Sequence, residues 1–451
     1  MSITDLPPEL LQLIGSHLNQ KDTCNLISTS HRMHSVFQRK LYTNVIFGKK
    51  NANSAQSFLY TVVRNPELAV CVQSLALACW ETHVDWETDR KSEKTIERPN
   101  FDGDLIRKLV DEATEYPEEE KSKWLQDLEE FYDDAWLALL IPRLTGLRKI
   151  GFEWPFGSSH VSVMLKNAAI NGGSCFLHLE EMHPFFIFPS VRKVSGWKVA
   201  ENAKEEEDLE PDLTEIPDPT EILKNLSLPS RCSNVTDIDL SQTNATGGMR
   251  EWIRACKTLK SFRIIHGGAC ISYDDIQPRR LYDSLSLHKP TLEAIWVEHD
   301  EYASNSDNET EWMGSFVGFS ALKFLRLSLY NLVGLNEEGS PTRKISDVIP
   351  SSLETLFLDI QWGDFCDVLD DLAEIATSRK FPKIATFHIE TCDQFSSPEE
   401  GLKVELLQQR CREVGVACHV HDTKSREYME GIRLRKSLWP QCEAEDLEFF
   451  W

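Results

Sequence analysis

A short hydrophobic pattern, apolar-x-x-apolar-x-apolar, recurs along most of the chain. From Val235 onward, successive copies begin 24, 33, 30, 31 and 31 residues apart. A nearly constant spacing of this kind is typical of stacked repeats, in which each copy contributes one strand. The copies are Val72-Leu75-Leu77, Leu147-Ile150-Phe152, Val235-Ile238-Leu240, Leu259-Phe262-Ile264, Leu292-Ile295-Val297, Leu322-Leu325-Leu327, Leu353-Leu356-Leu358 and Ile384-Phe387-Ile389, with Phe188-Val191-Val194 as a weaker member.

Segments with helical spacing of apolar residues lie between these predicted strands. A strand over 416–420 follows the last of them, and Gly415 fits a left-handed helix cap just before it. Strands that alternate with helices predict a parallel sheet whose crossover helices lie on the other side. The clearest helical sets are Met249, Trp252, Ile253 and Cys256; Phe365, Val368, Leu369, Leu372 and Ile375; and Leu402, Leu406, Leu407, Cys411 and Val414.

The first 47 residues have a different pattern, that of three short helices. Pro7 and Pro8 suit a first helical turn, because the N–H groups that proline lacks would be unpaired there. Asp22 is expected as the N-cap of a second helix, and a third runs from His31 to Leu41. So short a segment can bury only part of its apolar surface alone. Either the rest of this chain or a separate partner must cover the remainder.

The order Leu6-Pro7-x-Glu9-Leu10-Leu11, then Asp22-x-x-x-Leu26 and Leu41-Tyr42, resembles an F-box. The F-box is the small helical module that joins a protein to a cullin-based SCF (Skp–cullin–F-box) ubiquitin ligase. The resemblance implies a Skp-type adaptor as partner and a cullin beyond it. It also implies that the family's apolar positions, some facing the adaptor and some forming the module's core, fall on Leu6, Pro7, Leu10, Leu11, Ile14, Leu18, Leu26, Val36, Leu41 and Tyr42.

The repeated pattern is similar to the strand of a leucine-rich repeat. Two departures are the scarcity of Asn or Cys after the strand and the variable period. Both features fit the degenerate arrays found in F-box proteins, particularly fungal ones. The expected fold class is therefore α/β, with an N-terminal three-helix F-box followed by an irregular leucine-rich-repeat-like solenoid with a parallel sheet.

In such a repeat, the residues between the apolar positions line the concave face of the sheet. Trp296, Phe324 and Phe357 on neighbouring strands are a contact surface if they are exposed, because aromatic and arginine side chains dominate interface energetics. Alternatively, a helix, the acidic insert or the C-terminal tail covers them. The concave positions are Asp237, Asp239, Arg263, Trp296, Glu298, Phe324, Arg326, Phe357, Asp359, His388 and Glu390. The candidate target-binding residues among them are Arg263, Trp296, Phe324, Arg326, Phe357 and His388.

The predicted domains are an F-box over 1–47, a repeat domain over 48–425 and a tail over 426–451. Two insertions, near 83–141 and over 201–221, interrupt the repeats. The first starts as a polar loop and is mainly helical from 104 to 141, whereas the second is acidic and contains three prolines. We expect the aromatic tail to pack back onto the last repeats.

The net charge of −24 comes mainly from two segments. Residues 111–134 carry 11 acids and 2 lysines, and residues 204–221 carry 9 acids and 1 lysine. Nucleic acid is therefore an unexpected partner, because phosphate binding requires clustered basic residues. The chain has no long uncharged apolar run and no basic-then-apolar start, so we expect neither a membrane span nor a secretory signal. The cytoplasm or nucleus follows as the expected location.

No motif predicts catalysis, a cofactor or a metal. Cys411, Cys418, His419 and His421 offer metal ligands, but their spacing fits no common zinc module. Cys392 lies four residues after His388, a spacing that brings a nucleophile and base together only by chance. Glycine-rich phosphate loops and Gly-x-Ser-x-Gly are absent from the sequence. We therefore expect a substrate-recruiting subunit; the alternative is a scaffold that binds the adaptor without ligase activity.

Overall fold

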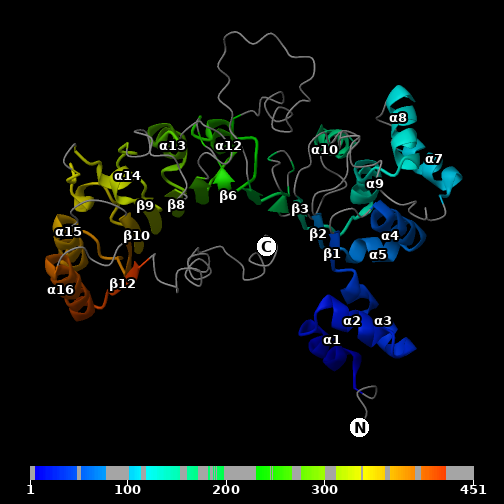
Figure 1. The fold of residues 1–451 in the computed structure, drawn as a ribbon, viewed down its shortest axis with the longest axis horizontal. Helices are drawn as coiled ribbons and strands as arrows, with labels where there is room; N and C mark the ends of the chain where they lie inside the picture. Colours follow the sequence, from blue (N-terminus) through cyan, green and yellow to red (C-terminus); the bar gives the residue numbers. More distant parts are fainter. Residues whose placement is uncertain are drawn as a thin grey trace. The chain divides into compact units, whose positions relative to one another are not determined.

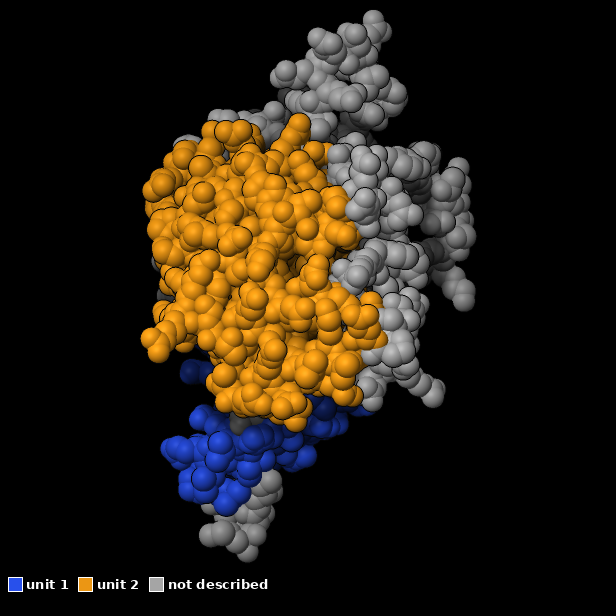
Figure 2. Space-filling view, turned by 90° about the vertical axis from the view of Figure 1, so that its left-hand side faces the viewer, with its two compact units in different colours: residues 1–191, 209–227 blue, residues 192–208, 228–451 orange. Residues whose placement is uncertain are grey.

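The chain forms two compact units that both alternate strands with helices (Figure 1). Unit 1 comprises residues 1–191 and 209–227, and unit 2 comprises 192–208 and 228–451 (Figure 2). The predicted α/β class, with an N-terminal helical module and a parallel sheet, is confirmed. The computed structural model describes residues 6–47, 52–77, 101–112, 118–152, 160–170, 181–182, 186, 188, 190–197, 230–243, 245, 247–266, 276–299, 311–336, 339–360, 366–391 and 398–422.

Three helices form the N-terminal module: α1 (Pro8–Ser16), α2 (Gln20–Ile27) and α3 (His31–Leu41). Proline occupies the first turn of α1, as predicted. The expected N-cap of α2 was wrong: the cap is Asn19, whose side-chain oxygen accepts the N–H of Asp22 at 2.8 Å. Asp22 instead lies in the first turn, where its charge favours the positive end of the helix dipole.

A small apolar core holds the three helices together. Leu11, Met33 and Phe37 are almost fully buried in it, and Leu6, Leu26, Ile27 and Val36 pack around them.

The helical module continues directly into a sheet. Strand β1 (Asn44–Phe47) pairs in parallel with β2 (Ser74–Leu77), with Asn44 opposite Ser74. Tyr42, at the end of α3, stacks on Phe58 of the following helix with 5.8 Å between ring centroids. The predicted domain boundary after residue 47 stays a prediction, but the first strand of the array precedes it.

The remainder of unit 1 adds two parallel strands and a group of helices. Strand β3 (Lys149–Phe152) pairs with β2 and with β4 (Glu181–Met182). The helical prediction for 104–141 is confirmed, whereas most of the predicted loop before it lies outside the described residues. The helices are α4 (Ala52–Arg64), α5 (Pro66–Cys71), α7 (Gly103–Asp111), α8 (Glu118–Glu129), α9 (Asp133–Leu140) and α10 (His160–Ile170).

Buried polar groups join α8, α9 and α10. The Asp134 carboxylate accepts the backbone N–H groups of His160 and Val161, at 2.7 and 3.4 Å, and so stabilises the positive start of α10. The His160 ring lies 2.6 Å from the Asp127 carboxylate and stacks on Trp124. The acidic residues of this segment are thus partly structural.

The described residues of unit 2 form eight parallel strands in chain order, with the helices on one side of them (Figure 1). The strands are β5 (Lys193–Trp197), β6 (Asp237–Thr243), β7 (Ser261–His266), β8 (Ala294–His299), β9 (Phe324–Ser328), β10 (Thr355–Ile360), β11 (Thr386–Thr391) and β12 (Ala417–Asp422). The α-helices are α12 (Arg250–Ala255), α13 (Pro278–Leu285), α14 (Leu329–Val333), α15 (Cys366–Thr377) and α16 (Pro398–Val414).

Each predicted strand from 235 onward is present. The apolar residues of the recurring pattern, such as Ile238 and Leu240, are buried on the side of the sheet that faces the helices. Gly415 has a φ of +79°, as its predicted role as a left-handed cap requires. The predicted apolar face of α16 was partly wrong. Leu407 and Cys411 are buried as expected, but the third buried apolar residue is Val404. Consequently, Leu402, Leu406 and Val414 are exposed.

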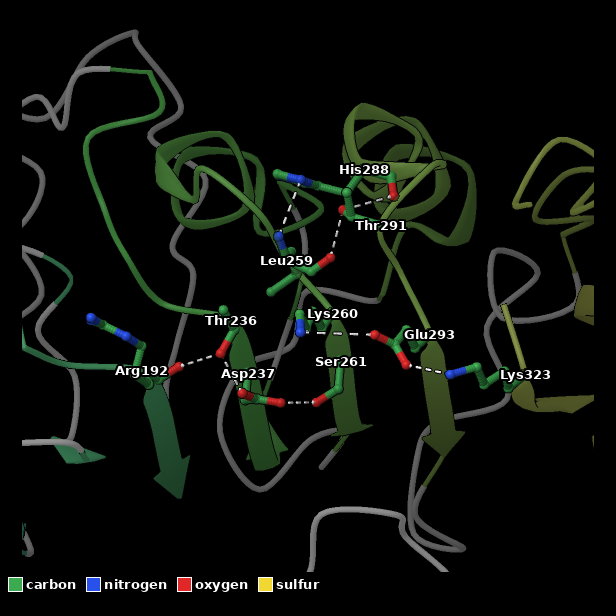
Figure 3. Close-up of polar contacts among 10 residues, drawn as sticks. All are labelled: Arg192, Thr236, Asp237, Leu259, Lys260, Ser261, His288, Thr291, Glu293 and Lys323. Carbon is green, nitrogen blue, oxygen red and sulfur yellow. Dashed lines mark hydrogen bonds and ion pairs between the residues drawn. The ribbon is translucent and has the colours of Figure 1, made fainter. Parts of the chain in front are cut away.

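Polar contacts at the beginnings of the strands connect neighbouring repeats (Figure 3). The Nδ1 atom of His288 accepts the Leu259 N–H at 3.3 Å, and its Nε2 lies 2.8 Å from the Ile253 carbonyl oxygen. These two bonds require the neutral ring with its proton on Nε2. Thr291 donates to the Leu259 carbonyl at 2.8 Å, and the Glu293 carboxylate pairs with Lys323 at 2.7 Å (Figure 3).

Gly146 should not tolerate a side chain, because a Cβ atom there would overlap the carbonyl oxygen of Val70. We expect Gly146→Ala to destabilise the protein by about 1–3 kcal/mol, the usual cost of overpacking. Gly401→Ala is the matched control: its Cβ meets open space in α16, and the change should stabilise by about 0.5–1 kcal/mol. Thermal unfolding of both variants tests the contrast, and equal melting temperatures would contradict it.

The buried neutral state of His288 predicts a pH-dependent stability. Burial lowers the pKa of His288 below its usual value, and the charge of Arg231 lowers it further. The hydrogen bond to the Ile253 carbonyl raises this pKa and offsets only part of the shift. Below about pH 6.5, the unfolded chain therefore binds more protons at this histidine than the folded chain does. Folding stability is consequently lost as the pH falls from about 6.5 to the lowered pKa of the folded state. His288→Asn should make the fall in melting temperature between pH 7 and 5 shallower than in the wild type. Identical slopes would exclude this contribution.

Candidate protein-interaction sites

Helix α1 presents an apolar ridge to solvent. Leu10 and Leu13 are 47% and 60% exposed, and Ile14 beside them is also exposed. These residues stand at i, i+3 and i+4, so they share one side of the helix, whereas Leu11 turns into the module's core with none of its surface exposed. Adjacent exposed apolar side chains on a small module indicate a contact surface for another protein.

A second candidate site is the face of the unit 2 sheet that lies away from the helices, here called the inner face. Strand register places one residue from each strand directly opposite its neighbours along this face. The line of residues at mid-strand is called the central row, and it consists of Asp239, Arg263, Trp296, Arg326, Phe357, His388 and His419.

Cations and aromatic rings alternate in the central row. The Arg326 guanidinium lies between two rings, 4.6 Å from the Trp296 centroid and 4.1 Å from that of Phe357. Arg263 covers Trp296 from the other side at 5.0 Å, and His388 stacks on Phe357 at 5.2 Å. Such stacking is favoured because strands are ~4.8 Å apart, close to ring-stacking distance.

Carboxylates from other strands pair with the two guanidinium groups. Arg263 Nη1 donates to Asp239 at 3.0 Å. Arg326 Nη2 lies 2.8 Å from Glu390 Oε2 and 3.3 Å from Glu298 Oε2, which also accepts the Trp296 indole N–H at 2.8 Å. Arg326 is only 1% exposed, so these carboxylates supply the compensation that a buried cation needs.

Three guanidinium nitrogens of the central row meet no acceptor in the part of the chain that the structure describes. Nε of Arg263, and Nε and Nη1 of Arg326, are buried and meet no hydrogen-bond partner among the described residues. A buried donor without an acceptor costs ~1–3 kcal/mol. These nitrogens therefore mark positions where the inner face lacks an acceptor.

Histidines end the row at β11 and β12. His388 Nδ1 lies 3.2 Å from His421 Nε2, and the His419 ring stacks on His388 at 4.9 Å. Burial, together with the neighbouring His419, His421 and Arg326, lowers the pKa of His388 to about 4. His388 is thus neutral at neutral pH and adds no charge to the inner face.

Two family models match the chain. The F-box domain model matches residues 3–43, and the leucine-rich repeat domain model matches residues 228–386. The chain combines an F-box with leucine-rich repeats. No curated protein and no solved structure matches it significantly. The fungal-type part of the predicted resemblance stays a prediction.

The structure sorts the predicted adaptor-binding residues of the F-box. Leu11 is a core residue. Pro7, Leu10 and Ile14 are exposed, whereas Leu6, Leu18, Leu26, Val36, Leu41 and Tyr42 are half-buried. Their contact with an adaptor stays a prediction. Leu13, the most exposed apolar residue of α1, was missed, although its spacing of three from Leu10 could have revealed it.

The sequence left open whether the aromatic and arginine side chains of the concave face are exposed or covered, and the structure shows them buried. Arg263, Trp296, Phe324, Arg326, Phe357 and His388 do come together, but each is at least nine-tenths buried. Along the central row, these side chains stack on one another and form ion pairs, so they contact each other at the surfaces that the prediction assigned to a target. Whether any of them contacts a target stays a prediction. The acidic insert and the tail, which were the alternative covers, lie outside the described residues.

The four residues considered as metal ligands do not form one cluster, although Cys411 and Cys418 contact each other. Cys411 is buried in α16, and Cys418 is opposite Phe387 on the helix side of the sheet. His419 and His421 alternate with Cys418 along β12 and therefore lie on the inner face. No group of three potential ligands occurs in the part of the chain that the structure describes. Cys392 lies outside the described residues.

Within the described ranges, no helix has the length and apolarity needed to cross a bilayer.

Removing Arg326 should be costly, because Glu298 and Glu390 would then lose the cation between them. We expect Arg326→Ala to destabilise unit 2 by about 3–5 kcal/mol. Lys323→Ala is the control: Lys323 also pairs with a glutamate, but both side chains are exposed and the pair is screened by water. Thermal unfolding should show a large drop for the first variant only, and equal drops would contradict a structural role for the buried pair.

Proposed function

We propose that this F-box/leucine-rich-repeat protein is the substrate-recognition subunit of an SCF ubiquitin ligase. The combination of the two domains supports a role in SCF-type substrate recognition. In the proposal, the F-box binds a Skp-type adaptor that connects to a cullin, and the repeats bind a protein target for ubiquitination. Ubiquitin transfer is then carried out by other subunits, in keeping with the typically non-catalytic role of such proteins.

The observation that carries the proposal is the apolar ridge on α1. Leu10, Leu13 and Ile14 are exposed at the start of a module whose core is complete without them. A separate protein can bury this ridge, and apolar anchors buried at an interface commonly contribute ~2 kcal/mol or more each. The proposal includes residence in the cytoplasm or nucleus, and no role for nucleic acid, membranes or a cofactor.

The ridge can be tested with a matched pair of double variants. Leu10→Ala/Leu13→Ala should weaken binding of a Skp-type adaptor at least roughly 30-fold, the equivalent of about 2 kcal/mol. Leu402→Ala/Leu406→Ala removes two leucines of similar exposure, 58% and 47%, from α16 and should leave adaptor binding unchanged. Calorimetric titration of the adaptor into each purified variant measures the difference.

The same proteins distinguish a ligase subunit from an adaptor-binding scaffold. Affinity purification of the wild type should recover both adaptor and cullin, and the α1 variant should recover neither. Adaptor without cullin would favour the scaffold. If the wild type binds no adaptor, or if both double variants lose it equally, the proposed role of the F-box is wrong.

A further inference from the structure

The inner face of unit 2 carries more negative than positive charge. Among the described residues of β5–β12, five carboxylates, two guanidinium groups and the Lys193 ammonium group face this side, which gives −2 when the histidines are neutral. The guanidinium groups are those of Arg263 and Arg326. The carboxylates are those of Asp237, Asp239, Glu298, Asp359 and Glu390.

The two kinds of charge lie at different depths. The Arg263 and Arg326 side chains are 5% and 1% exposed, whereas their partners Asp239 and Glu298 are 19% and 18% exposed. The arginines therefore support the carboxylates from beneath, and the carboxylate oxygens are the charged atoms that a partner reaches. This assignment reverses the roles predicted from sequence, in which the arginines themselves contacted the target.

One inner-face carboxylate is held by hydroxyl groups instead of a cation. Asp237 accepts hydrogen bonds from Ser261 at 2.8 Å and from Thr236 at 2.6 Å (Figure 3). Its charge is therefore solvated by hydroxyl groups, and the residue opposite it on β5 is Lys193. Half-buried carboxylates thus occur on the inner face from β6 to β8.

We propose that the inner face of unit 2 binds a lysine- or arginine-rich segment of the target protein. This inference rests on the proposed function and names the chemistry of the target that the repeats recruit. Charge complementarity carries it: the accessible charges are carboxylates, and cationic side chains are their complement.

Phosphorylated or acidic segments do not fit the same face. A phosphate would have to displace Glu390 or Glu298 from Arg326, and it would meet the remaining carboxylates at close range. Like charges brought together at an interface suppress binding of the wrong partner. The inner face therefore selects against an anionic target.

The test uses a fluorescein-labelled decalysine peptide and the full chain in complex with its adaptor. Asp239→Asn/Glu298→Gln removes two inner-face charges while keeping acceptor oxygens for Arg263, Arg326 and Trp296. Fluorescence anisotropy at physiological salt should show about 10-fold weaker binding for this variant. The control Glu251→Gln/Glu405→Gln removes the same charge from exposed positions on α12 and α16, and it should change the affinity by less than about 2-fold.

A conservative variant separates loss of charge from loss of folding. Asp239→Glu/Glu298→Asp keeps both charges and should keep most of the affinity. The inference is overturned if wild type does not bind decalysine, if both neutralised pairs lose affinity equally or not at all, or if a decaglutamate peptide binds more tightly. Adaptor binding is measured on the same samples. If it persists while the decalysine result fails, only this inference is wrong; if it is absent in the wild type, the proposed function itself fails.

Discussion

The parallel register of the strands in unit 2 is the constraint on which the inner face depends. Each strand is aligned with the next so that equivalent positions of successive repeats lie directly opposite one another. Side chains that are about 30 residues apart in sequence therefore become neighbours at strand spacing. Hydrogen bonds at the strand starts, such as those of His288 and Thr291, maintain this alignment between repeats.

The register of the strands that forms the inner face also brings charged side chains close together. Two arginines and several carboxylates are brought into a poorly solvated row, where unpaired charges are costly. Ion pairs between strands offset this cost: Asp239 pairs with Arg263, and both Glu298 and Glu390 pair with Arg326. Aromatic rings fill the space between the cations. The arginines consequently stabilise the sheet, and the less buried acids determine the character of the surface.

In the F-box, by contrast, apolar side chains are left exposed. Its core consists of Leu11, Met33 and Phe37 with their half-buried neighbours, whereas Leu10, Leu13 and Ile14 on the other side of α1 are exposed. Three short helices cannot enclose all their apolar side chains. The exposed ridge is thus a direct consequence of the module's size, and a partner protein is the natural means of covering it.

Periodicity determined the architecture from the sequence alone. The recurring pattern located the strands from 235 onward, and the order of Leu, Pro and Glu residues near the N-terminus identified the F-box. These features are local, so neighbouring residues suffice to specify them. The sequence also predicted that Arg263, Trp296 and Arg326 lie on the same face of the sheet, because side chains alternate between the two faces along a strand.

Tertiary structure decided exposure and role. Leu10 and Leu11 are adjacent and chemically identical, yet one is exposed and the other is core, because only the packing of α3 against α1 distinguishes them. Similarly, Arg326 is a plausible target contact by composition, but its burial between two rings and two carboxylates makes it structural. Burial depends on residues distant in sequence, and no local pattern encodes the depth at which a side chain comes to lie.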